Sequence, residues 1–499
     1  PKRDYYRGKT VLLTGATGFL GQLYLEKILR CDVKCLYVLT RPKRGVPIEK
    51  RIEELFSGVL IRQNKKCYKK IKIIEGDMAK LQLALSEKDR LELEENVEII
   101  IHAAANVRFD EKLRNLLITN LRGTRELLRI AENMKKLQVT AYISTAYSHC
   151  YRHDIDEIFY PPAIDPDVMI KFAEKFTDMT DEKLEILTDL IIKPWPNTYT
   201  YTKALSEELV RRFGQKKPIC IIRPSIVIST HEDPIPGWCN NIYGLNGVLV
   251  ACGMGVMRIL PYKDNVIGDI VCADFVINST LAAIWVTYED TKLKQQEDTN
   301  SDPQIYHVCS CVDRPVTYNQ IQADTASTFA KYPAKRMLWK HSPNAASGPL
   351  TFQIFTIYYH VIPGFFFDLY LSFKNEKVRL MPVYRKVQRF LIALKYFMVN
   401  QYRFTNDNMK RVLARMSPED AEFFPSDVRR YDWKNFVFDY VNGLKKFIGY
   451  ENLNDLEIAR KRYAKLCILH FIVKCFYYVK TCFLFFSSIV GTCPDLLLL

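Results

Sequence analysis

The stretch Thr10-Val-Leu-Leu-Thr-Gly-Ala-Thr-Gly-Phe-Leu-Gly21 lies near the start of the chain and decides its fold. Its apolar beginning predicts a buried strand, and the residues Phe19–Arg30 predict an amphipathic helix. The glycines between them stand where a tight turn, a close approach to a pyrophosphate and close helix–strand packing each exclude a side chain. The helix N-terminus offers free N–H groups and positive partial charge to phosphates. A dinucleotide site is therefore expected, lined by Thr14, Gly15, Thr17, Gly18, Phe19, Leu20 and Gly21.

The end of the next expected strand, Cys35–Thr40, indicates which dinucleotide binds. NAD sites usually carry an Asp or Glu there, hydrogen-bonded to the ribose 2′-hydroxyl. Here the place is taken by Arg41, with Arg44 close behind it. A guanidinium binds a 2′-phosphate through two parallel hydrogen bonds, whereas a carboxylate repels it. A solvated basic loop is the alternative, and the pattern favours NADPH.

The composition is that of a globular protein with more than one folded unit. The chain has 499 residues, of which 48% are hydrophobic and 25% charged, and its net charge is +15. Because Lys and Arg are spread among acidic residues, no nucleic-acid-binding arm is expected; a phosphate-rich substrate or an anionic membrane suits the balance better. The 14 Cys form no C-x-x-C pair and there is no H-E-x-x-H sequence. Neither a metal site nor a disulfide framework is expected, and reduced thiols in a cytosolic setting are the default.

Apolar runs alternate with helical stretches up to about residue 225, which predicts an α/β fold with a doubly wound parallel sheet. From Thr230 the chain becomes irregular and rich in Pro and Gly, as is typical of a substrate-binding extension. The expected strands are Thr10–Thr14, Cys35–Thr40, Ile71–Glu75, Val97–Ala103, Thr140–Ser144, Ile219–Ile222 and, further on, Ile305–Cys309.

Shifts in composition divide the chain into four parts. Residues 1–292 are expected to form the NADPH-binding domain with its substrate-binding insertions. Residues 293–349 are expected to complete the substrate region and to contain a linker. Residues 350–450 predict a small helical domain, and residues 460–499 an apolar tail.

Two apolar segments of the C-terminal half raise the question of a membrane. In Leu350–Phe373 only His360 and Asp368 can carry charge near neutral pH. Pro363 and Gly364 in its centre favour a buried or membrane-skimming segment over a spanning helix.

The tail is expected to be a membrane anchor, as one span or a re-entrant hairpin. It follows the basic cluster Arg460–Lys465 and is almost free of charge. A buried terminal helix is the alternative. A basic cluster in front of a span keeps the catalytic part on the cytosolic side. The endoplasmic reticulum is weakly favoured over the peroxisome, since Leu496–Leu499 is not a peroxisomal signal. The oligomeric state stays open.

Tyr199 and Lys203 are the expected catalytic pair. Hydride transfer to a carbonyl builds negative charge on oxygen, which a donor must hold and an acid must protonate. Tyr-x-x-x-Lys places both side chains on one helix face, where the ammonium lowers the Tyr pKa from about 10 toward working pH. The pattern also occurs at Tyr5, Tyr68, Tyr288 and Tyr370. Only Tyr199 follows a helix-capping Asn197 and precedes an apolar strand.

Other polar and small residues are expected at the carboxyl edge of the same sheet. Ser144 and Thr145 compete for the oxyanion role, because strand alternation places them on opposite faces. Asn120 is read equally well as a helix-face Asn or as a residue that positions a water or the Lys203 surroundings. His102 is expected to be a packed strand residue. The remaining expected cofactor contacts are Asp77, Ala103, Ala104, Pro224 and Ile226.

Taken in order, these motifs resemble one family. They are Thr14-Gly-Ala-Thr-Gly-Phe-Leu-Gly21, His102-Ala-Ala-Ala105, Ser144-Thr-Ala-Tyr147, Asn197-Thr-Tyr-Thr-Tyr-Thr-Lys-Ala-Leu205 and Arg223-Pro-Ser-Ile-Val227. The chain is similar to the alcohol-forming fatty acyl-CoA reductases, extended short-chain dehydrogenase/reductases, from about residue 7 to about residue 444. The segment His360-Val-Ile-Pro-Gly-Phe-Phe-Phe-Asp368 resembles the start of that family's C-terminal male-sterility domain, although Gly364 stands where Ala is expected.

The resemblance implies a reduction in two stages. Hydride from NADPH attacks the thioester of a long-chain acyl-CoA, Tyr199 and Thr145 stabilise the oxyanion, coenzyme A leaves, and a second NADPH reduces the aldehyde to a primary alcohol. Lys203 binds the nicotinamide ribose. Membrane lipid is the other expected partner. The alternatives are a sugar-nucleotide epimerase, a membrane-bound hydroxysteroid dehydrogenase and an inactive reductase-like scaffold.

Overall fold

The computed structural model describes residues 2–41, 50, 69–175, 181–297, 302–376, 379–451 and 453–492. Its centre is a seven-stranded sheet in which every neighbouring pair is parallel. The order of the strands reverses direction between β1 and β4, as in a doubly wound fold. The strands in spatial order are β11 (Gln304–Val308), β7 (Ile219–Pro224), β5 (Val139–Ile143), β4 (Ile99–His102), β1 (Thr10–Thr14), β2 (Cys35–Thr40) and β3 (Ile71–Glu75).

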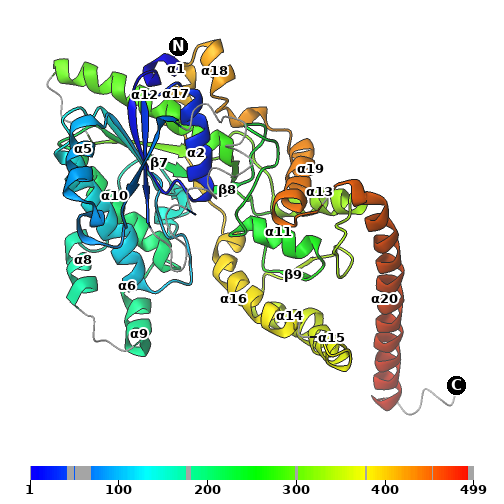
Figure 1. The fold of residues 1–499 in the computed structure, drawn as a ribbon. Helices are drawn as coiled ribbons and strands as arrows, with labels where there is room; N and C mark the ends of the chain where they lie inside the picture. The colour runs from blue at the N-terminus through cyan, green and yellow to red at the C-terminus, as the bar shows by residue number, and fades with distance from the viewer. Residues whose placement is uncertain are drawn as a thin grey trace.

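Helices cover both faces of this sheet (Figure 1). One face packs against α2 (Phe19–Arg30) and α12 (Ala273–Glu297), and the other against α5 (Glu87–Asn96), α7 (Gly123–Glu132) and α10 (Thr198–Gly214). Successive strand residues point to opposite faces. Accordingly, Val11 and Leu13 belong to the first core and Leu12 to the second.

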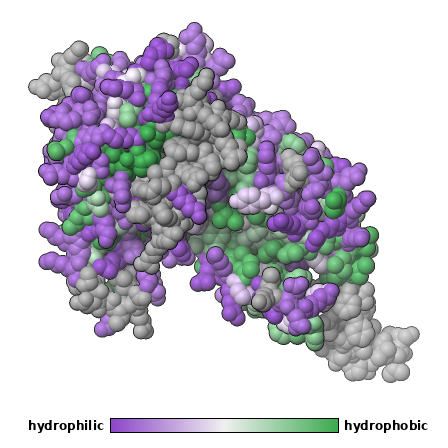
Figure 2. All heavy atoms as spheres, in the orientation of Figure 1, coloured by the Kyte–Doolittle hydropathy of each residue, from purple (hydrophilic) through white to green (hydrophobic). Residues whose placement is uncertain are grey.

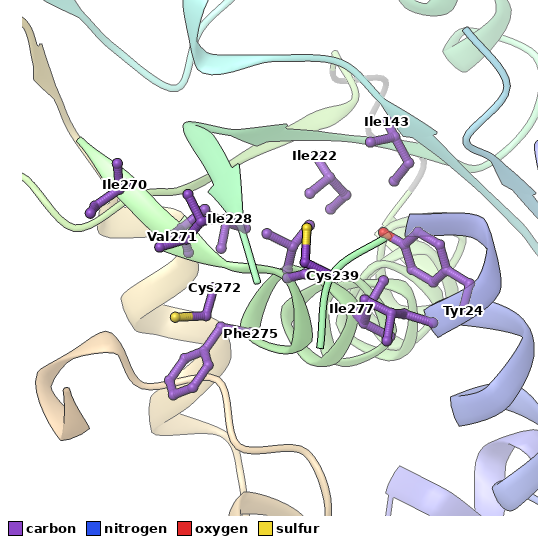
Figure 3. Close-up of a cluster of buried hydrophobic side chains, with 14 of the residues drawn as sticks. Tyr24, Ile143, Ile222, Ile228, Cys239, Ile270, Val271, Cys272, Phe275 and Ile277 are labelled. Atoms are coloured by element: carbon purple, nitrogen blue, oxygen red, sulfur yellow. The ribbon is translucent and has the colours of Figure 1, made fainter. Parts of the chain in front are cut away.

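The core on the α2 side joins the sheet to the C-terminal half of the chain. Figure 3 shows Ile143 and Ile222 from the sheet together with Tyr24 of α2 and Ile277 of α12. The Tyr24 hydroxyl is 2.7 Å from the Thr280 hydroxyl on α12, so the two helices are held by a buried hydrogen bond as well as by packing.

The alternating fold class is confirmed, and most of the expected strands are present. β1, β2, β3 and α2 begin and end at the expected residues. β4 is shorter than the expected Val97–Ala103, and β5 begins and ends one residue before the expected Thr140–Ser144. The sheet ends earlier at these two strands because residues 103–105 and 144–145 turn out of it toward the site.

The expected domain boundary at residue 292 is corrected by the structure. It falls inside α12, and β11 beyond it pairs with β7 in the main sheet, with Ile305 opposite Ile221. The sheet unit therefore reaches Val308. Position 292 looks like a boundary in sequence because a polar stretch follows it, but the apolar strand after that stretch returns to the sheet edge.

The C-terminal half is mostly helical and is tied to the sheet unit by short strands. β13 (Arg403–Phe404) pairs with β6 (Asp154–Ile155). The other short strands are β8 (Ile226–Ile228), β9 (Ile259–Leu260), β10 (Ile270–Cys272) and β12 (Asn344–Ala345). The remaining long elements are α8 (Pro166–Lys175), α9 (Asp181–Ile191), α11 (Leu245–Gly253), α13 (Tyr318–Lys331), α14 (Pro349–Thr356), the π-turn η5 (Ile357–Val361), α15 (Ile362–Phe373), α16 (Leu380–Val399), α17 (Asp407–Ala414), α18 (Pro418–Phe423), α19 (Trp433–Gly443) and α20 (Leu456–Thr492).

The structure describes the first of the two apolar segments in full and the second, the tail, only in part. In the described part of the chain, Pro349–Phe373 is the one helix that is long and apolar enough to cross a membrane, and little of it is buried. The buried alternative for this segment is therefore wrong. The expected tail anchor, 460–499, is helical to Thr492; its side chains from residue 476 and its last residues lie outside the described part.

Candidate active site

The glycine loop after β1 has no room for side chains. Gly15 has φ +77°, and a Cβ there would lie 2.7 Å from the Ala104 amide nitrogen. A Cβ on Gly21 would lie 2.0 Å from the Gly15 carbonyl oxygen, so only glycine lets α2 begin so close to the loop. Gly18 is the N-cap of α2 and supplies no side-chain cap. The first N–H groups of α2 therefore point into a cradle that fits a pyrophosphate.

A chain of hydrogen bonds fixes the loop after β4 against this cradle. The Ala104 amide donates to Thr14 Oγ1 at 3.2 Å, and Thr14 Oγ1 is 2.8 Å from His102 Nδ1. On the other side of the ring, His102 Nε2 is 3.0 Å from Thr124 Oγ1, whose own hydrogen is used on the Asn120 carbonyl. Since Thr124 must accept, Nε2 carries the ring hydrogen and Nδ1 accepts from Thr14.

His102 is thus a packed strand residue, as expected. Burial, with a smaller contribution from Lys203, lowers its pKa to about 3, so the ring is neutral. Its place between two hydroxyls aligns the ends of β1 and β4. Ala103 and Ala104 follow directly and face the glycine loop.

Asn120 holds the same loop one step further along. It lies in a π-turn, Leu117–Arg122, and is 2% exposed. Its Oδ1 accepts from the Asn106 amide at 2.8 Å, and its Nδ2 donates to the Asn106 carbonyl at 3.0 Å. The structure therefore gives Asn120 a positioning role toward the β4 loop, with a longer contact of 3.5 Å to Thr202 on α10.

Tyr199 and Lys203 lie on the first turns of α10, which begins as expected. The Asn197 side chain caps the helix by accepting from the Thr200 amide at 2.9 Å. Lys203 Nζ donates to the Ile143 carbonyl at the end of β5, at 2.6 Å. The Tyr199 ring stacks on Phe109 with 5.8 Å between ring centroids.

The electrostatics of this pair differ from the simple expectation. Burial lowers the pKa of Lys203 to about 7, and Glu207 acts in the opposite direction. Burial raises the pKa of Tyr199, and no lowering by Lys203 accompanies it. The Lys203 ammonium donates to the Ile143 carbonyl and lies 4.7 Å from the centre of the Tyr142 ring.

Ser144 and Thr145 differ in the hydrogen-bond partners of their hydroxyl groups. Ser144 Oγ donates to Glu207 Oε1 at 2.6 Å in the interior. Thr145 Oγ1 lies at the start of the short helix η4 (Ala146–His149), where it accepts from the Tyr147 amide at 3.2 Å; its own contact to the Pro224 carbonyl is long, 3.5 Å. The Ser144 hydrogen is committed, whereas that of Thr145 is only weakly held.

Glu207 belongs to a buried ionic cluster that sequence reasoning missed. Arg223, which is 0% exposed, donates to both Glu207 oxygens at 2.9 and 2.7 Å. Burial alone would raise the pKa of Glu207, but Arg223 and His149 outweigh it and hold the pKa well below its ordinary value. The signal in the sequence was the spacing: Glu207 follows Lys203 by four residues and so lies on the same face of α10.

The cluster continues into the C-terminal half. Arg223 Nη1 is 3.2 Å from His307 Nε2 on β11, and His307 Nδ1 is 2.6 Å from the Thr405 carbonyl, just after β13. An aromatic contact runs in parallel, because Phe397 at the end of α16 lies 5.5 Å from Phe109. The helical C-terminal part therefore contacts the site at two places, at the Arg223 cluster and at the Phe109 ring.

The remaining expected cofactor residues lie along the same sheet edge. Arg41 directly follows β2, whose Leu39 is opposite Thr14 of β1. Asp77 follows β3 and accepts from the Ala79 amide at 2.9 Å. Pro224 ends β7, and Ile226 begins β8. Arg44 lies outside the described residues.

One group of possible metal ligands occurs in the described part of the chain. Asp269, Cys309 and Cys311 bring their ligand atoms within 4.8 Å of one another, a Cys-x-Cys spacing that a search for C-x-x-C does not find. Both Asp269 oxygens already accept backbone amides, from Ser310 at 2.8 Å and from Cys311 at 3.1 Å. The arrangement is that of a carboxylate capping a turn.

Comparisons with known proteins agree with this geometry. Two family models, both described as male sterility protein, match residues 13–280 and 359–451, and the first is an NAD-binding model. The chain is 36% identical to fatty acyl-CoA reductase 1 of Pongo abelii over 93% of this chain and 89% of that protein. It is 34% identical to human fatty acyl-CoA reductase 2 over 94% and 90%.

A solved structure shares the fold. The reductase domain of a nonribosomal peptide synthetase from Mycobacterium tuberculosis superposes with a TM-score of 0.58 and covers 90% of this chain and 95% of its own, at 18% identity. At that identity the likeness concerns the fold alone.

Proposed function

The chain belongs to the fatty acyl-CoA reductase family and is an oxidoreductase with a nicotinamide cofactor; from this premise we propose that it reduces long-chain acyl-CoA to primary fatty alcohol, with NADPH as the hydride donor. The thioester is first reduced to an aldehyde with release of coenzyme A, and the aldehyde is then reduced to the alcohol. Each stage consumes one hydride and one proton. The bound cofactor supplies the hydride.

The proposal is supported by the placement of α10 and Thr145 at the carboxyl ends of two neighbouring strands: Lys203 Nζ lies on the Ile143 carbonyl at the end of β5, Thr145 Oγ1 is 3.5 Å from the Pro224 carbonyl at the end of β7, and Tyr199 is one turn before Lys203 on α10. The proposed role of Tyr199 is to donate a proton to the carbonyl oxygen as charge builds on it. The high pKa of the buried phenol keeps its proton available for this step. Thr145 is the proposed second donor to the oxyanion, since its hydroxyl is weakly held where that of Ser144 is not.

Lys203 is proposed to bind the nicotinamide ribose and to hold α10 to β5. Its pKa of about 7 lets it exist in both protonation states near neutral pH. NADPH is proposed over NADH because Arg41 stands where NAD sites carry a carboxylate.

For location we propose a membrane-attached enzyme with its catalytic part in the cytosol, on the endoplasmic reticulum. The support is the basic cluster Arg460–Lys465 in front of the apolar tail. The same cytosolic side offers acyl-CoA and NADPH to the site.

The deciding experiment supplies palmitoyl-CoA and NADPH to membranes that carry the protein, and identifies the lipid products. The parent is expected to form fatty alcohol. Tyr199→Phe, which removes only the donor hydroxyl, is expected to lose at least about 100-fold in kcat, the usual contribution of general acid catalysis. Tyr201→Phe on the same helix is the matched control, because the Tyr201 hydroxyl is buried without a hydrogen-bond partner in the structure. If NADPH is not consumed with acyl chains of any length, the acyl-CoA proposal fails.

A further inference from the structure

We propose that Pro349–Phe373 lies in the interfacial layer of a lipid bilayer, as a helix that dips into the membrane without crossing it. α14, η5 and α15 form one continuous helix over these residues. The proposal concerns attachment and does not depend on the reaction that the enzyme catalyses. It adds a second membrane contact to the tail.

The distribution of side chains on this helix is the reverse of that in a soluble protein. Phe365 is 58%, Phe366 62% and Phe373 81% exposed. A helix of a soluble domain turns its apolar stripe to the core and its polar residues to water. The other large apolar side chains that this helix exposes are Leu350, Ile354, Phe355, Ile357, Ile362, Phe367, Leu369 and Tyr370.

What the helix buries is one narrow stripe. Phe352, Thr356, His360 and Gly364 are buried, each four residues from the next, and thus lie on one face. Three of these four residues are polar or lack a side chain. The stripe fixes the helix to the body of the protein, and the apolar faces are left outside.

The stripe is fastened by specific contacts. His360 Nε2 accepts from the Arg258 amide at 2.9 Å, and its ring stacks on Tyr384 of α16 at 5.0 Å. A Cβ on Gly364 would lie 2.8 Å from the Tyr384 ring, so glycine permits the close approach of α15 and α16. A helix held in this way along two of its turns cannot stand alone across a bilayer, which favours an interfacial position.

The charge beside the helix matches an anionic lipid surface. α16 packs against α15 and contains Arg385, Lys386, Arg389 and Lys395 but no Asp or Glu. The single acid of the apolar helix, Asp368, is used to cap α16, accepting from the Leu380 and Met381 amides at 2.5 and 3.0 Å. Basic residues next to exposed Phe and Leu are the pattern of a membrane-surface helix.

The surroundings favour a bilayer over a second copy of the chain. Two copies that met through this face would bring their basic α16 helices together, with like charges opposed.

Figure 1 shows α15 and the C-terminal part of α20 on the same side of the molecule. Figure 2 shows hydrophobic side chains gathered over the C-terminal half, whereas the sheet unit is mostly hydrophilic on that face. α20 itself exposes Ile468 and Phe471.

The test measures which segments meet lipid. The full-length protein is reconstituted in vesicles of phosphatidylcholine with a minority of phosphatidylserine, and a carbene reagent dissolved in the bilayer is photoactivated. Peptides from 349–373 are expected to be labelled at least about fivefold more than those from α9. The matched control α9 exposes Ile186 and Leu190 to the same degree, 62% and 63%, but it carries acidic residues. Equal labelling of the two helices would overturn the proposal.

Two sets of variants separate the apolar from the electrostatic contribution. Phe365→Glu with Phe366→Glu is expected to reduce labelling of 349–373 to the α9 level, with an unchanged thermal unfolding midpoint in detergent because both side chains are exposed. Arg385→Gln, Lys386→Gln and Arg389→Gln together are expected to lower labelling several-fold in phosphatidylserine vesicles and much less in pure phosphatidylcholine. Unchanged labelling of 349–373 in the glutamate variant, or cross-links from 349–373 to a second copy, would contradict the bilayer contact.

Discussion

Two helices of this protein depart from the usual distribution of side chains, and they do so in opposite directions. α10 buries polar and charged groups, among them Lys203, Ser206 and Glu207. The helix over Pro349–Phe373 exposes apolar groups and buries Thr356 and His360. Packing into the core of a soluble protein explains neither distribution of side chains. In α10 the Lys203 ammonium is bonded to the end of β5 and the Glu207 carboxylate to Arg223, and in the other helix we propose lipid as the partner of the exposed side chains.

The buried polar groups of α10 each connect this helix to a particular neighbouring element. Glu207 and Arg223 form a pair that joins α10 to β7, and His307 extends it to the C-terminal half. Exposed Phe365 and Phe366, by contrast, make no contribution to such a network. α10 should therefore be sensitive to polar substitutions, and the exposed faces of the Pro349–Phe373 helix tolerant of them.

The largest effect is expected for Glu207→Gln. The substitution keeps the shape but leaves Arg223 without a counter-charge in the interior, which costs about 3–5 kcal/mol for a broken buried pair. Thermal unfolding of the full chain in detergent should show a midpoint several degrees lower, and turnover should fall with it. Glu208→Gln on the same helix is the control. Glu208 is itself buried, but the side chains of its partners Arg211 and Arg212 are 33% and 39% exposed, so their charges stay hydrated when Glu208 is neutralised and the pair is worth about 1 kcal/mol or less. Equal shifts of the unfolding midpoint for the two substitutions would show that the buried cluster contributes no more to stability than the Glu208 pairs do.

A smaller effect, with a distinct pH dependence, is expected for Lys203→Met. Burial lowers the folded-state pKa of Lys203 from 10.5 to about 7, so between these values the unfolded chain binds the additional proton. The contribution of Lys203 to the stability of the parent then rises with pH across this window, by at most about 1.4 kcal/mol per pH unit, and is lowest below pH 7.

Lys203→Met lacks this titration. The variant should be more stable than the parent at pH 6, and the difference should shrink as the pH rises toward 10. It should also lose most of its activity, since the variant cannot make the contact to the nicotinamide ribose that we propose for Lys203. Unfolding midpoints measured across that pH range test the sign, and parallel profiles for both proteins would mean that Lys203 keeps an ordinary pKa.

The smallest effect on stability is expected for Phe366→Ser. Because this side chain is already exposed, the free energy of unfolding in detergent should change by no more than about 0.5 kcal/mol. Phe352→Ser, on the buried stripe of the same helix, should cost about 3 kcal/mol or more. A large loss for Phe366→Ser would mean that this face packs against protein and would remove the contrast between the two helices.

The site could be predicted from sequence where its residues are close along the chain. The glycine loop, Asn197 as a cap and the Tyr199–Lys203 spacing were all found because each is a local pattern, and the structure has the loop, the cap and the helix. The choice between Ser144 and Thr145 was open because neighbouring hydroxyls look alike until Glu207 is seen to accept from one of them.

The parts that sequence reasoning missed depend on distant residues. The charge of Arg223 is used on Glu207, 16 residues earlier on another element, and no local pattern links the two residues. β11 was expected after a domain boundary, but it completes the sheet next to β7. Nothing in the local composition of either segment shows which neighbour it will meet.

The glycine cradle, the alternation of strands and helices and the helix that carries Tyr199 and Lys203 follow from the amino-acid sequence, because each rests on short-range sterics and on periodicity within one element. Contacts between distant segments are needed to show which of the two hydroxyls is weakly held, which charges pair in the interior and which faces of Pro349–Phe373 stay exposed. Those outcomes depend on packing between segments far apart in the chain, where burial sets the free energy of every charge and every apolar surface.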